Sequence, residues 1–232
     1  MRTVNPEEHA RKRAHILRAA ATEFAAHGVD GTSTARICRA AGIGSGTLFH
    51  YFATKRDIFH ALFGDDVPRN AEACARALAA DRPDDGIDLL LDHLLADLAD
   101  PLAPGLAVAA VLQANRDEEF ARLVVADTAQ IRDALHTLTG RLAAAGGQLA
   151  FPPARVAGWI QNLIDGAYFT SGDPGFDPAA HAAELRRIVA WLTGREPAGQ
   201  GPTGQEPPEE PTDRERTPAH AEPADGPSPS PA

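Results

Sequence analysis

The sequence predicts an all-α protein of about nine helices, and three observations support this. Apolar residues recur at spacings of three and four along most of the 232-residue chain. A period-two alternation, which would indicate half-buried strands, is not convincing anywhere. Gly, Pro, Asn and Ser stand between the apolar segments, at positions suited to helix ends. The pattern favours helices packed on helices.

The N-terminal quarter of the chain contains four predicted helices with clear start and stop signals. They cover residues 5–28, 33–42, 45–52 and 54–63. Asn5 and Ser33 are good N-caps because their side-chain oxygens can accept from the first free amides. Gly28 and Gly42 are expected to end their helices, because glycine readily adopts the left-handed conformation.

The following segment contains longer predicted helices, each with an apolar row. They cover residues 69–80, 84–99, 104–115, 117–145, 154–170 and 178–193. In helix 117–145, for example, Ile131, Leu135, Leu138 and Leu142 fall on one face. The spacing shows that a face is buried but leaves open what covers it.

The C-terminal segment 195–232 has a different composition. It holds ten of the 19 prolines and almost no large apolar side chains, so it cannot bury enough surface to offset the entropy of ordering. We expect a disordered, Pro-rich acidic tail. A passive solubilising role is favoured over a specific one.

Composition excludes several classes of protein. No run of 18 apolar residues is present, so no membrane span is expected, and the N-terminus lacks the apolar core of a secretory signal. Cys38 and Cys74 fit no zinc or disulfide spacing and are expected to be buried thiols. We therefore expect a cytoplasmic protein with no metal and no cofactor.

Charge is distributed unevenly along the chain. The net charge is −10, yet residues 1–60 carry nine Lys or Arg against five Asp or Glu, a local charge of +4. The remaining 13 basic and 27 acidic residues give −14. A basic module attracts phosphate locally whatever the total, so the asymmetry points to a nucleic-acid partner for the N-terminal part.

Residues 33–52 have the pattern of a helix-turn-helix, two short helices joined by a Gly-containing turn. Leu48 and Phe52, one helical turn apart, would anchor the second helix to the core. Ser45, Thr47 and His50 would then point away from it. In this motif the second helix enters the major groove of DNA.

The stretch "ICRAAGIGSGTLFHYFATKRDIF" resembles the TetR family of bacterial transcriptional regulators. The matching positions are Ala41-Gly42, Ile43, Gly46-Thr47-Leu48, Phe49, Tyr51-Phe52 and Lys55. The resemblance covers about residues 10–63. It implies the domain boundaries 1–9 (an arm and the start of helix one), 10–65 (DNA-binding) and 66–194 (ligand-binding and dimerisation), and composition marks 195–232 as the tail.

The resemblance also implies which residues meet DNA. Ser45, Gly46 and Thr47 would lie near bases. Thr47 or His50 would either contact a base directly or brace the helix in the groove. The full predicted set is Ser33, Thr34, Arg36, Ser45, Gly46, Thr47, Phe49, His50, Tyr51 and Lys55. Of these, Ser33, Tyr51 and Lys55 would hold phosphates.

Three positions depart from the family pattern. Phe49 stands where the family usually has Tyr, so a phosphate-bonding hydroxyl is lost. Gly44-Ser45 replaces a common Ser-Lys, which removes a basic side chain. Ala35-Arg36 breaks the usual capping box of the preceding helix, although Arg36 could itself contact DNA.

The second domain is implied to sense a ligand and to dimerise, and a twofold dimer also suits a palindromic site. The predicted dimer interface comprises Ile160, Ile164, Leu185, Ile188, Val189 and Leu192. An alternative is that these rows face only the monomer's own core. The predicted pocket comprises Gln113, Asn115, Trp159, Asn162, Tyr168 and Phe169, any of which could instead be core or interface.

The resulting expectation is a dimeric repressor that leaves a palindromic double-stranded DNA operator when a small-molecule effector binds. An activator or a ligand-independent regulator of the same family is the alternative. A helical protein-interaction module is less favoured. So is an enzyme, because no GxSxG, HExxH, P-loop or CxxC motif is present and no catalytic residue stands out.

Overall fold

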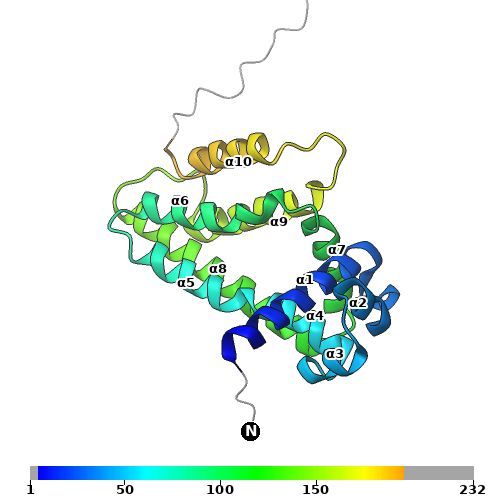
Figure 1. The fold of residues 1–232 in the computed structure, drawn as a ribbon. Coiled ribbons are helices and arrows are strands. Elements are labelled where there is room, and N and C mark those ends of the chain that lie inside the picture. The colour runs from blue at the N-terminus through cyan, green and yellow to red at the C-terminus, as the bar shows by residue number, and fades with distance from the viewer. Residues whose placement is uncertain (1–4, 196–232) are drawn as a thin grey trace, which may run out of the picture. The chain divides into compact units, whose positions relative to one another are not determined.

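The computed structural model describes residues 5–195, and within that range every regular element is a helix. This confirms the predicted fold class. The N-terminal helices are α1 (Pro6–Gly31), α2 (Thr34–Ala41), α3 (Ser45–Tyr51) and α4 (Lys55–Gly64) (Figure 1). They are followed by α5 (Asp66–Leu78), α6 (Pro83–Leu94), a 3₁₀ turn η1 (Ala96–Ala99), α7 (Ala103–Ala114), α8 (Glu118–Ala144), α9 (Pro153–Thr170) and α10 (Pro178–Leu192). The predicted tail, apart from Arg195, lies outside the described residues.

Helix starts follow the capping residues that the sequence contains. The Asn5 side chain accepts from the amide of Glu7 at 3.0 Å, and α1 begins there. At α4, the Thr54 hydroxyl accepts from the Asp57 amide at 3.1 Å, and the Asp57 carboxylate accepts from the Thr54 amide at 2.9 Å. This reciprocal pair satisfies two amides that have no partner inside the helix.

Gly28 bends α1 but does not end it, contrary to the sequence prediction. Its φ of 65° and ψ of 179° interrupt the helix, and a further turn runs to Gly31. The buried Thr32 hydroxyl lies 3.0 Å from the carbonyl oxygen of Glu23 and 2.8 Å from that of Gly28, and its one hydrogen can donate to either. Thr32 thus ties the end of α1 back to the turn before the bend.

One apolar core joins α1–α4 to the helices that follow. Phe59 of α4 packs against Phe24 of α1 with ring centroids 5.1 Å apart, and against Phe120 of α8 at 5.0 Å. All three rings are fully buried. Because Phe120 belongs to α8, the first four helices do not form a core on their own.

The second apolar core lies among α5, α6, α8, α9 and α10. It contains the row Ile131, Leu135, Leu138 and Leu142 of α8, as the sequence predicts. Figure 1 shows α5, α6, α8 and α9 stacked together, with α10 beyond α9.

Among residues 5–195, no single helix is long and apolar enough to cross a membrane. Only the bent pair Pro83–Ala99 with Ala103–Ala114 passes such a test, by length and composition.

Two boundaries differ from prediction. The expected helix 69–80 begins at Asp66, so Pro68 sits in the first turn, where its missing N–H is not needed. The expected helix 84–99 breaks at Leu95 into α6 and η1. Leu95 and Leu98 are both buried, and the tighter 3₁₀ turn places residues three apart on one side.

A glycine sets how closely α7 approaches α1. A Cβ on Gly105 would lie 2.4 Å from the carbonyl oxygen of Ala25, well inside contact distance. Only glycine therefore allows the two helix backbones to come this close. The contact joins the N-terminal helices to the helix that leads into the second core.

Candidate functional site

The helix-turn-helix predicted over residues 33–52 is formed by α2 and α3. Gly42 ends α2 in the left-handed conformation, with φ 62° and ψ 33°. The amide of Ile43 then bonds to the carbonyl of Cys38 at 3.0 Å, which closes the helix end. Leu48 is fully buried and Phe52 is 6% exposed, so these two side chains anchor α3 to the core.

The outer edge of α3, called the reading edge below, carries five of the ten residues predicted to meet DNA: Ser45, Gly46, Thr47, Phe49 and His50. Ser45, Gly46, Thr47 and His50 are exposed. Phe49 is 52% exposed, although a ring of this size would normally be buried. The predicted reading edge is therefore one continuous solvent-facing surface opposite Leu48.

Two glycines on this edge are not required by packing against the described residues. A Cβ on Gly44 or Gly46 would meet no heavy atom within 4 Å, and neither residue has a positive φ. Gly46 lies within α3, where glycine costs about 0.5–1 kcal/mol relative to alanine. A missing side chain in open space suits a surface that another molecule approaches closely.

Tyr51 is held from one side by the start of α1. Its ring centroid lies 4.5 Å from that of His9 and 5.2 Å from that of His50. The Arg13 guanidinium lies over the neighbouring Phe52 ring at 5.6 Å. The first turns of α1 therefore flank the C-terminal end of α3, and the residues of both helices share one surface.

Lys55 has a partner that the sequence did not reveal. Its ammonium donates to the carbonyls of Val29 at 2.5 Å and Thr32 at 2.7 Å, where the chain leaves α1. Two of its three N–H donors are thus used within the chain. Its predicted phosphate contact depends on the third.

Arg36 and its neighbours pack along α1. The Ser33 hydroxyl caps α2 by accepting from the Arg36 amide at 3.2 Å, and Thr34 is partly buried. The Arg36 guanidinium donates to Glu23 at 2.8 Å and also contacts His27. This hydrogen bond lowers the pKa of the Glu23 carboxyl. Arg36 is therefore engaged by α1 rather than extended into solvent.

A buried carboxylate connects α4 to the start of α8. Asp117, 4% exposed in its side chain, accepts from Arg56 at 2.6 Å on each oxygen and from His60 at 2.7 Å. It also accepts from Gln113 at 3.1 Å and from the Phe120 amide at 3.1 Å, which caps α8. The Arg56 hydrogen bonds are the main reason that the pKa of Asp117 lies well below its usual range.

Two side chains at this junction have partners that the sequence does not reveal. The His60 side chain is 16% exposed and hydrogen-bonded to Asp117. Gln113 was expected to line a pocket, but its side-chain amide donates a hydrogen bond to Asp117. His60 meets Asp117 across 57 residues of sequence, which helical spacing within one segment cannot show, whereas Gln113 lies only four residues before Asp117.

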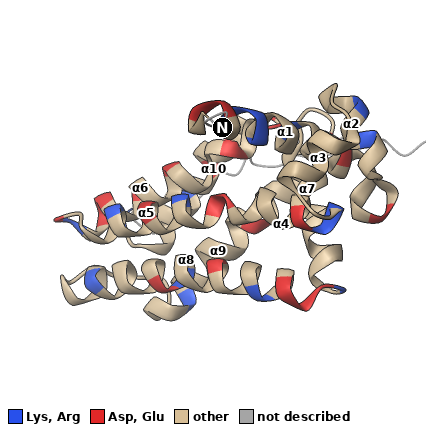
Figure 2. Cartoon of the chain, turned by 60° about the horizontal axis from the view of Figure 1, so that its bottom comes forward, with Lys and Arg blue, Asp and Glu red and all other residues tan. Residues whose placement is uncertain are grey.

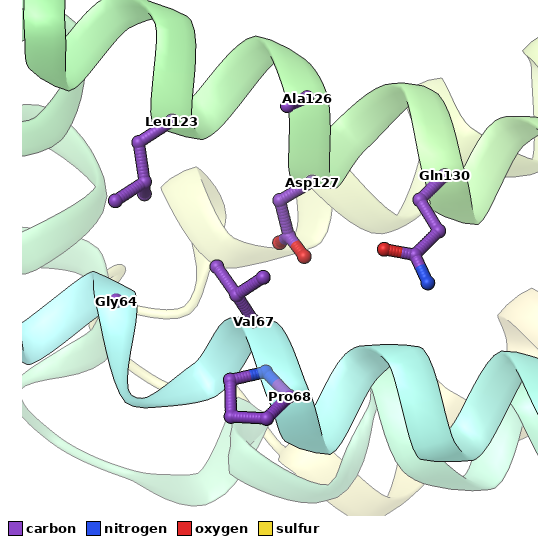
Figure 3. Close-up of a pocket in the computed structure, with 7 residues that line it drawn as sticks. All are labelled: Gly64, Val67, Pro68, Leu123, Ala126, Asp127 and Gln130. Atoms are coloured by element: carbon purple, nitrogen blue, oxygen red, sulfur yellow. The ribbon is translucent and has the colours of Figure 1, made fainter.

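A groove of about 470 Å³ lies between α5 and α8, beside the end of α4 (Figure 3). Its wall is mostly apolar, with two polar side chains on α8. The lining residues are Gly64, Val67, Pro68, Leu123, Ala126, Asp127 and Gln130. Its size falls within the range of small-molecule sites.

The predicted pocket residues lie elsewhere. Trp159, Asn162 and Phe169 of α9 point to solvent, with Trp159 45% and Phe169 46% exposed. Asn115 is exposed and bonds back to the carbonyl of Val111 at 2.8 Å. The Tyr168 hydroxyl donates to the carbonyl of Leu94 at 2.7 Å. The groove in Figure 3 contains none of these residues.

Five of the six predicted dimer-interface residues lie in the chain's own core. Ile160, Ile164, Leu185, Val189 and Leu192 are at most 4% exposed. They form the inner rows of α9 and α10, and this corrects the prediction in favour of the alternative. Ile188 is 41% exposed and remains available.

Charges of both signs are mixed along most helices. Figure 2 shows Lys and Arg interspersed with Asp and Glu on α5, α6 and α8.

Between residues 5 and 195, no group of three or more His, Cys, Asp or Glu side chains is arranged to hold a metal ion.

Sequence reasoning missed Asp127 as a groove residue and Asn70 as its hydrogen-bond partner. Asn70 and Asp127 lie 57 positions apart, and each looks like an ordinary polar residue on a helix surface. Asp117 was open to detection, because an Asp just before "EEF" is a good N-cap for the next helix.

The sequence of this chain is similar to those of known bacterial regulators. Residues 16–62 match the sequence profile of "Bacterial regulatory proteins, tetR family". The "HTH-type transcriptional repressor Rv1474c" of Mycobacterium tuberculosis is 32% identical over 139 residues, covering 57% of this chain and 71% of that protein. The "HTH-type transcriptional repressor AcnR" of Corynebacterium diphtheriae is 36% identical over 75 residues, covering 32% of this chain and 40% of that protein. The chain therefore matches less than half the length of AcnR.

A solved structure shares the fold. The crystal structure of a TetR-family transcriptional regulator from Agrobacterium tumefaciens superimposes with a TM-score of 0.66 and 21% sequence identity. The match covers 82% of this chain and 100% of that chain.

Proposed function

Because the chain belongs to the TetR family of bacterial regulatory proteins, we propose that it is a cytoplasmic, dimeric transcriptional repressor that binds a palindromic DNA operator. In this proposal a small-molecule effector releases it from DNA. The repressor role, rather than that of an activator, is favoured because both relatives above are named transcriptional repressors.

The observation that carries the proposal is the exposed edge of α3. Apart from Phe49, its residues are small or polar, they face away from the anchor Leu48, and two glycines leave the backbone uncovered. A helix of this kind can lie in the major groove with Ser45, Thr47 and His50 at base edges. Ser33, Tyr51 and the third donor of Lys55 are proposed to hold the flanking phosphates.

Dimerisation is proposed to use the outer faces of α9 and α10. Trp159, Phe169, Ile188 and Trp191 are large apolar side chains between 41% and 46% exposed. Gly158 and Gly166 on α9 have open space around them, so a second helix could approach closely. Two copies related by a twofold axis would present two α3 helices to successive major grooves, roughly 34 Å apart.

The Arg56–Asp117 junction is proposed to transmit the effector signal. The groove lies against α8, and α8 begins at the carboxylate that Arg56 of α4 holds. A shift of α8 on ligand binding would move α4, which directly follows α3. Effector and operator then weaken each other's binding by the same factor.

The experiment that tests the proposal is a selection of genomic fragments by the purified protein, followed by gel shifts on the enriched sequence. We expect an inverted repeat, and an affinity that falls steeply with salt because phosphate contacts release counterions. Thr47→Ala should weaken binding at least about tenfold. Thr137→Ala, an exposed threonine on α8, is the matched control and should leave the affinity unchanged. Enrichment of no sequence over random duplex would refute the proposal.

A further inference from the structure

The carboxylate of Asp127 in α8 is only half satisfied by the protein. Its Oδ2 accepts from the Asn70 amide at 2.8 Å. Its Oδ1 is buried and, among the residues that the structure describes, has no hydrogen-bond partner. A buried carboxylate oxygen without a donor costs free energy. Figure 3 shows this carboxylate on the wall of the groove, facing α5.

The neighbouring hydrogen bonds all point toward Asp127. The carboxylate accepts, so Asn70 must present its amide N–H to it and its carbonyl to the other side. That carbonyl lies 2.8 Å from Nε2 of His93, which must therefore donate. The chain His93–Asn70–Asp127 thus ends in an acceptor at the groove, and only an incoming donor can complete it.

Burial of the acidic groups in this region also favours a cation, because their negative charge is removed from water. Burial raises the pKa of Asp127 and of Asp66, and repulsion from Asp97 and Asp127 adds to the rise at Asp66. Burial, together with the nearby Asp97 and Asp66, raises the pKa of Tyr168 to about 12. Arg69 offsets part of this negative field by pairing with Asp66 at 2.9 Å.

The rest of the groove suits an apolar body. Val67, Pro68, Leu123 and Ala126 supply its wall, and a volume of about 470 Å³ holds a small organic molecule. Gln130 is the other polar side chain on the wall. An occupant would touch α5, α8 and Gly64 at the end of α4 together.

We propose that this groove binds a small molecule with an apolar body and a protonated amine, which pairs with the carboxylate of Asp127. The inference rests on the proposed regulatory function and names the chemical class of its effector. The amine supplies both a hydrogen-bond donor and a compensating positive charge. Asp127 therefore makes the groove selective for a cationic ligand over a neutral or anionic one.

Three probes with one body and different head groups test this. Phenylbutylamine, phenylbutanol and phenylbutyrate are titrated into the wild-type protein by calorimetry without DNA. We expect the amine to bind at least about tenfold more tightly than the alcohol and the acid. Equal or tighter binding of either would overturn the proposal, as would no amine binding up to about 1 mM.

Variants assign the effect to one carboxylate. Asp127→Asn keeps the shape and the Asn70 bond but removes the charge, and it should lower amine affinity at least about tenfold. Asp133→Asn, on an exposed face of the same helix, is the matched control and should bind as wild type does. Unchanged amine affinity in Asp127→Asn would also overturn the proposal.

A stability measurement separates a binding role from a structural one. Because the empty site buries an incompletely paired carboxylate, Asp127→Asn should raise the Tm at neutral pH. The gain should grow as pH rises above the ordinary Asp value of 3.8, because the unfolded chain then loses this proton while burial makes its loss from the folded protein costly. A lower Tm in Asp127→Asn would show that the carboxylate stabilises the fold, and would count against the proposal.

Gel shifts with the selected operator keep this inference distinct from the proposed function. Wild-type protein that binds the operator but not phenylbutylamine overturns the ligand class alone. Protein that binds no operator overturns the regulatory function, while calorimetry still decides what the groove accepts.

Discussion

Arg56 of α4 and Asp117 at the start of α8 form a two-point ion pair, with both N–O distances 2.6 Å. The carboxylate is buried and also caps α8. The pair therefore ties the helix that follows the reading helix α3 to the helix that lines the groove. Such a fixed contact between two helices can pass a displacement from one to the other.

Asp117→Asn is expected to lower the Tm by several degrees at neutral pH, because Arg56 and His60 lose their charged acceptor. The pKa of Asp117 is depressed in the fold. Its contribution is therefore present above the unfolded pKa and is lost as pH falls through the acidic range. Wild type should lose stability below about pH 4, and Asp117→Asn should lose less over that range. Thermal unfolding at a series of pH values measures this, and parallel curves for the two proteins would contradict it.

Gly105→Ala should destabilise the protein by about 1–3 kcal/mol, because the new methyl group overlaps the Ala25 carbonyl of α1. Gly140→Ala in α8 is the control, since a Cβ there meets nothing within 4 Å. The control should be neutral or more stable by about 0.5–1 kcal/mol. Urea unfolding compares the two variants. Equal stabilities would show that α1 and α7 are not held at this distance in solution.

Gly46→Ala separates DNA binding from stability. The substitution adds a methyl group in open space within α3, so stability should be unchanged or higher by up to about 1 kcal/mol. Operator affinity should nevertheless fall at least about tenfold, because the methyl group keeps the backbone from the groove floor. A gel shift beside a thermal scan tests both. Full operator affinity would mean that the backbone does not approach DNA at this position.

Phe49→Tyr restores the residue that the family usually carries at this position. The ring is 52% exposed, so its edge can reach a phosphate when α3 lies in the groove. A phenolic hydrogen bond to phosphate should tighten operator binding by up to about tenfold. Titration of the selected operator measures the change. An unaltered affinity would show that the missing hydroxyl is irrelevant.

Trp191→Glu is expected to shift the dimer to monomers, because a charge on the outer face of α10 cannot be buried against a second copy. Val125→Glu, at a position on α8 that is 66% exposed, is the control for a charge on an apolar surface residue. Light scattering after size exclusion gives the mass. A dimer that persists in Trp191→Glu would place the interface elsewhere.

The sequence allowed the reading edge to be predicted because its signals are local. Glycine at position 42 needs a left-handed turn, and Leu48 with Phe52 fixes the buried side of α3. The apolar rows of α9 and α10 were also correctly found. Their partner was not, because a periodic row shows burial without showing whether the same chain or a second one covers it.

Contacts between distant segments escaped prediction for the same reason. Lys55 reaches carbonyls 26 and 23 residues away, and Asn70 meets Asp127 across 57. None of these residues has a local signal that names its partner. The groove forms where α5 packs against α8, so its lining residues cannot be identified from the sequence of either helix alone.

The exposed edge of α3 is proposed to read a DNA sequence. The most direct test measures the affinities of wild type and a Thr47→Ala/His50→Ala variant for the selected operator and for random duplex at one salt concentration. We predict that the variant loses most of its preference for the operator but keeps the wild-type affinity for random duplex, because phosphate contacts remain. An undiminished operator preference in the variant would contradict the claim.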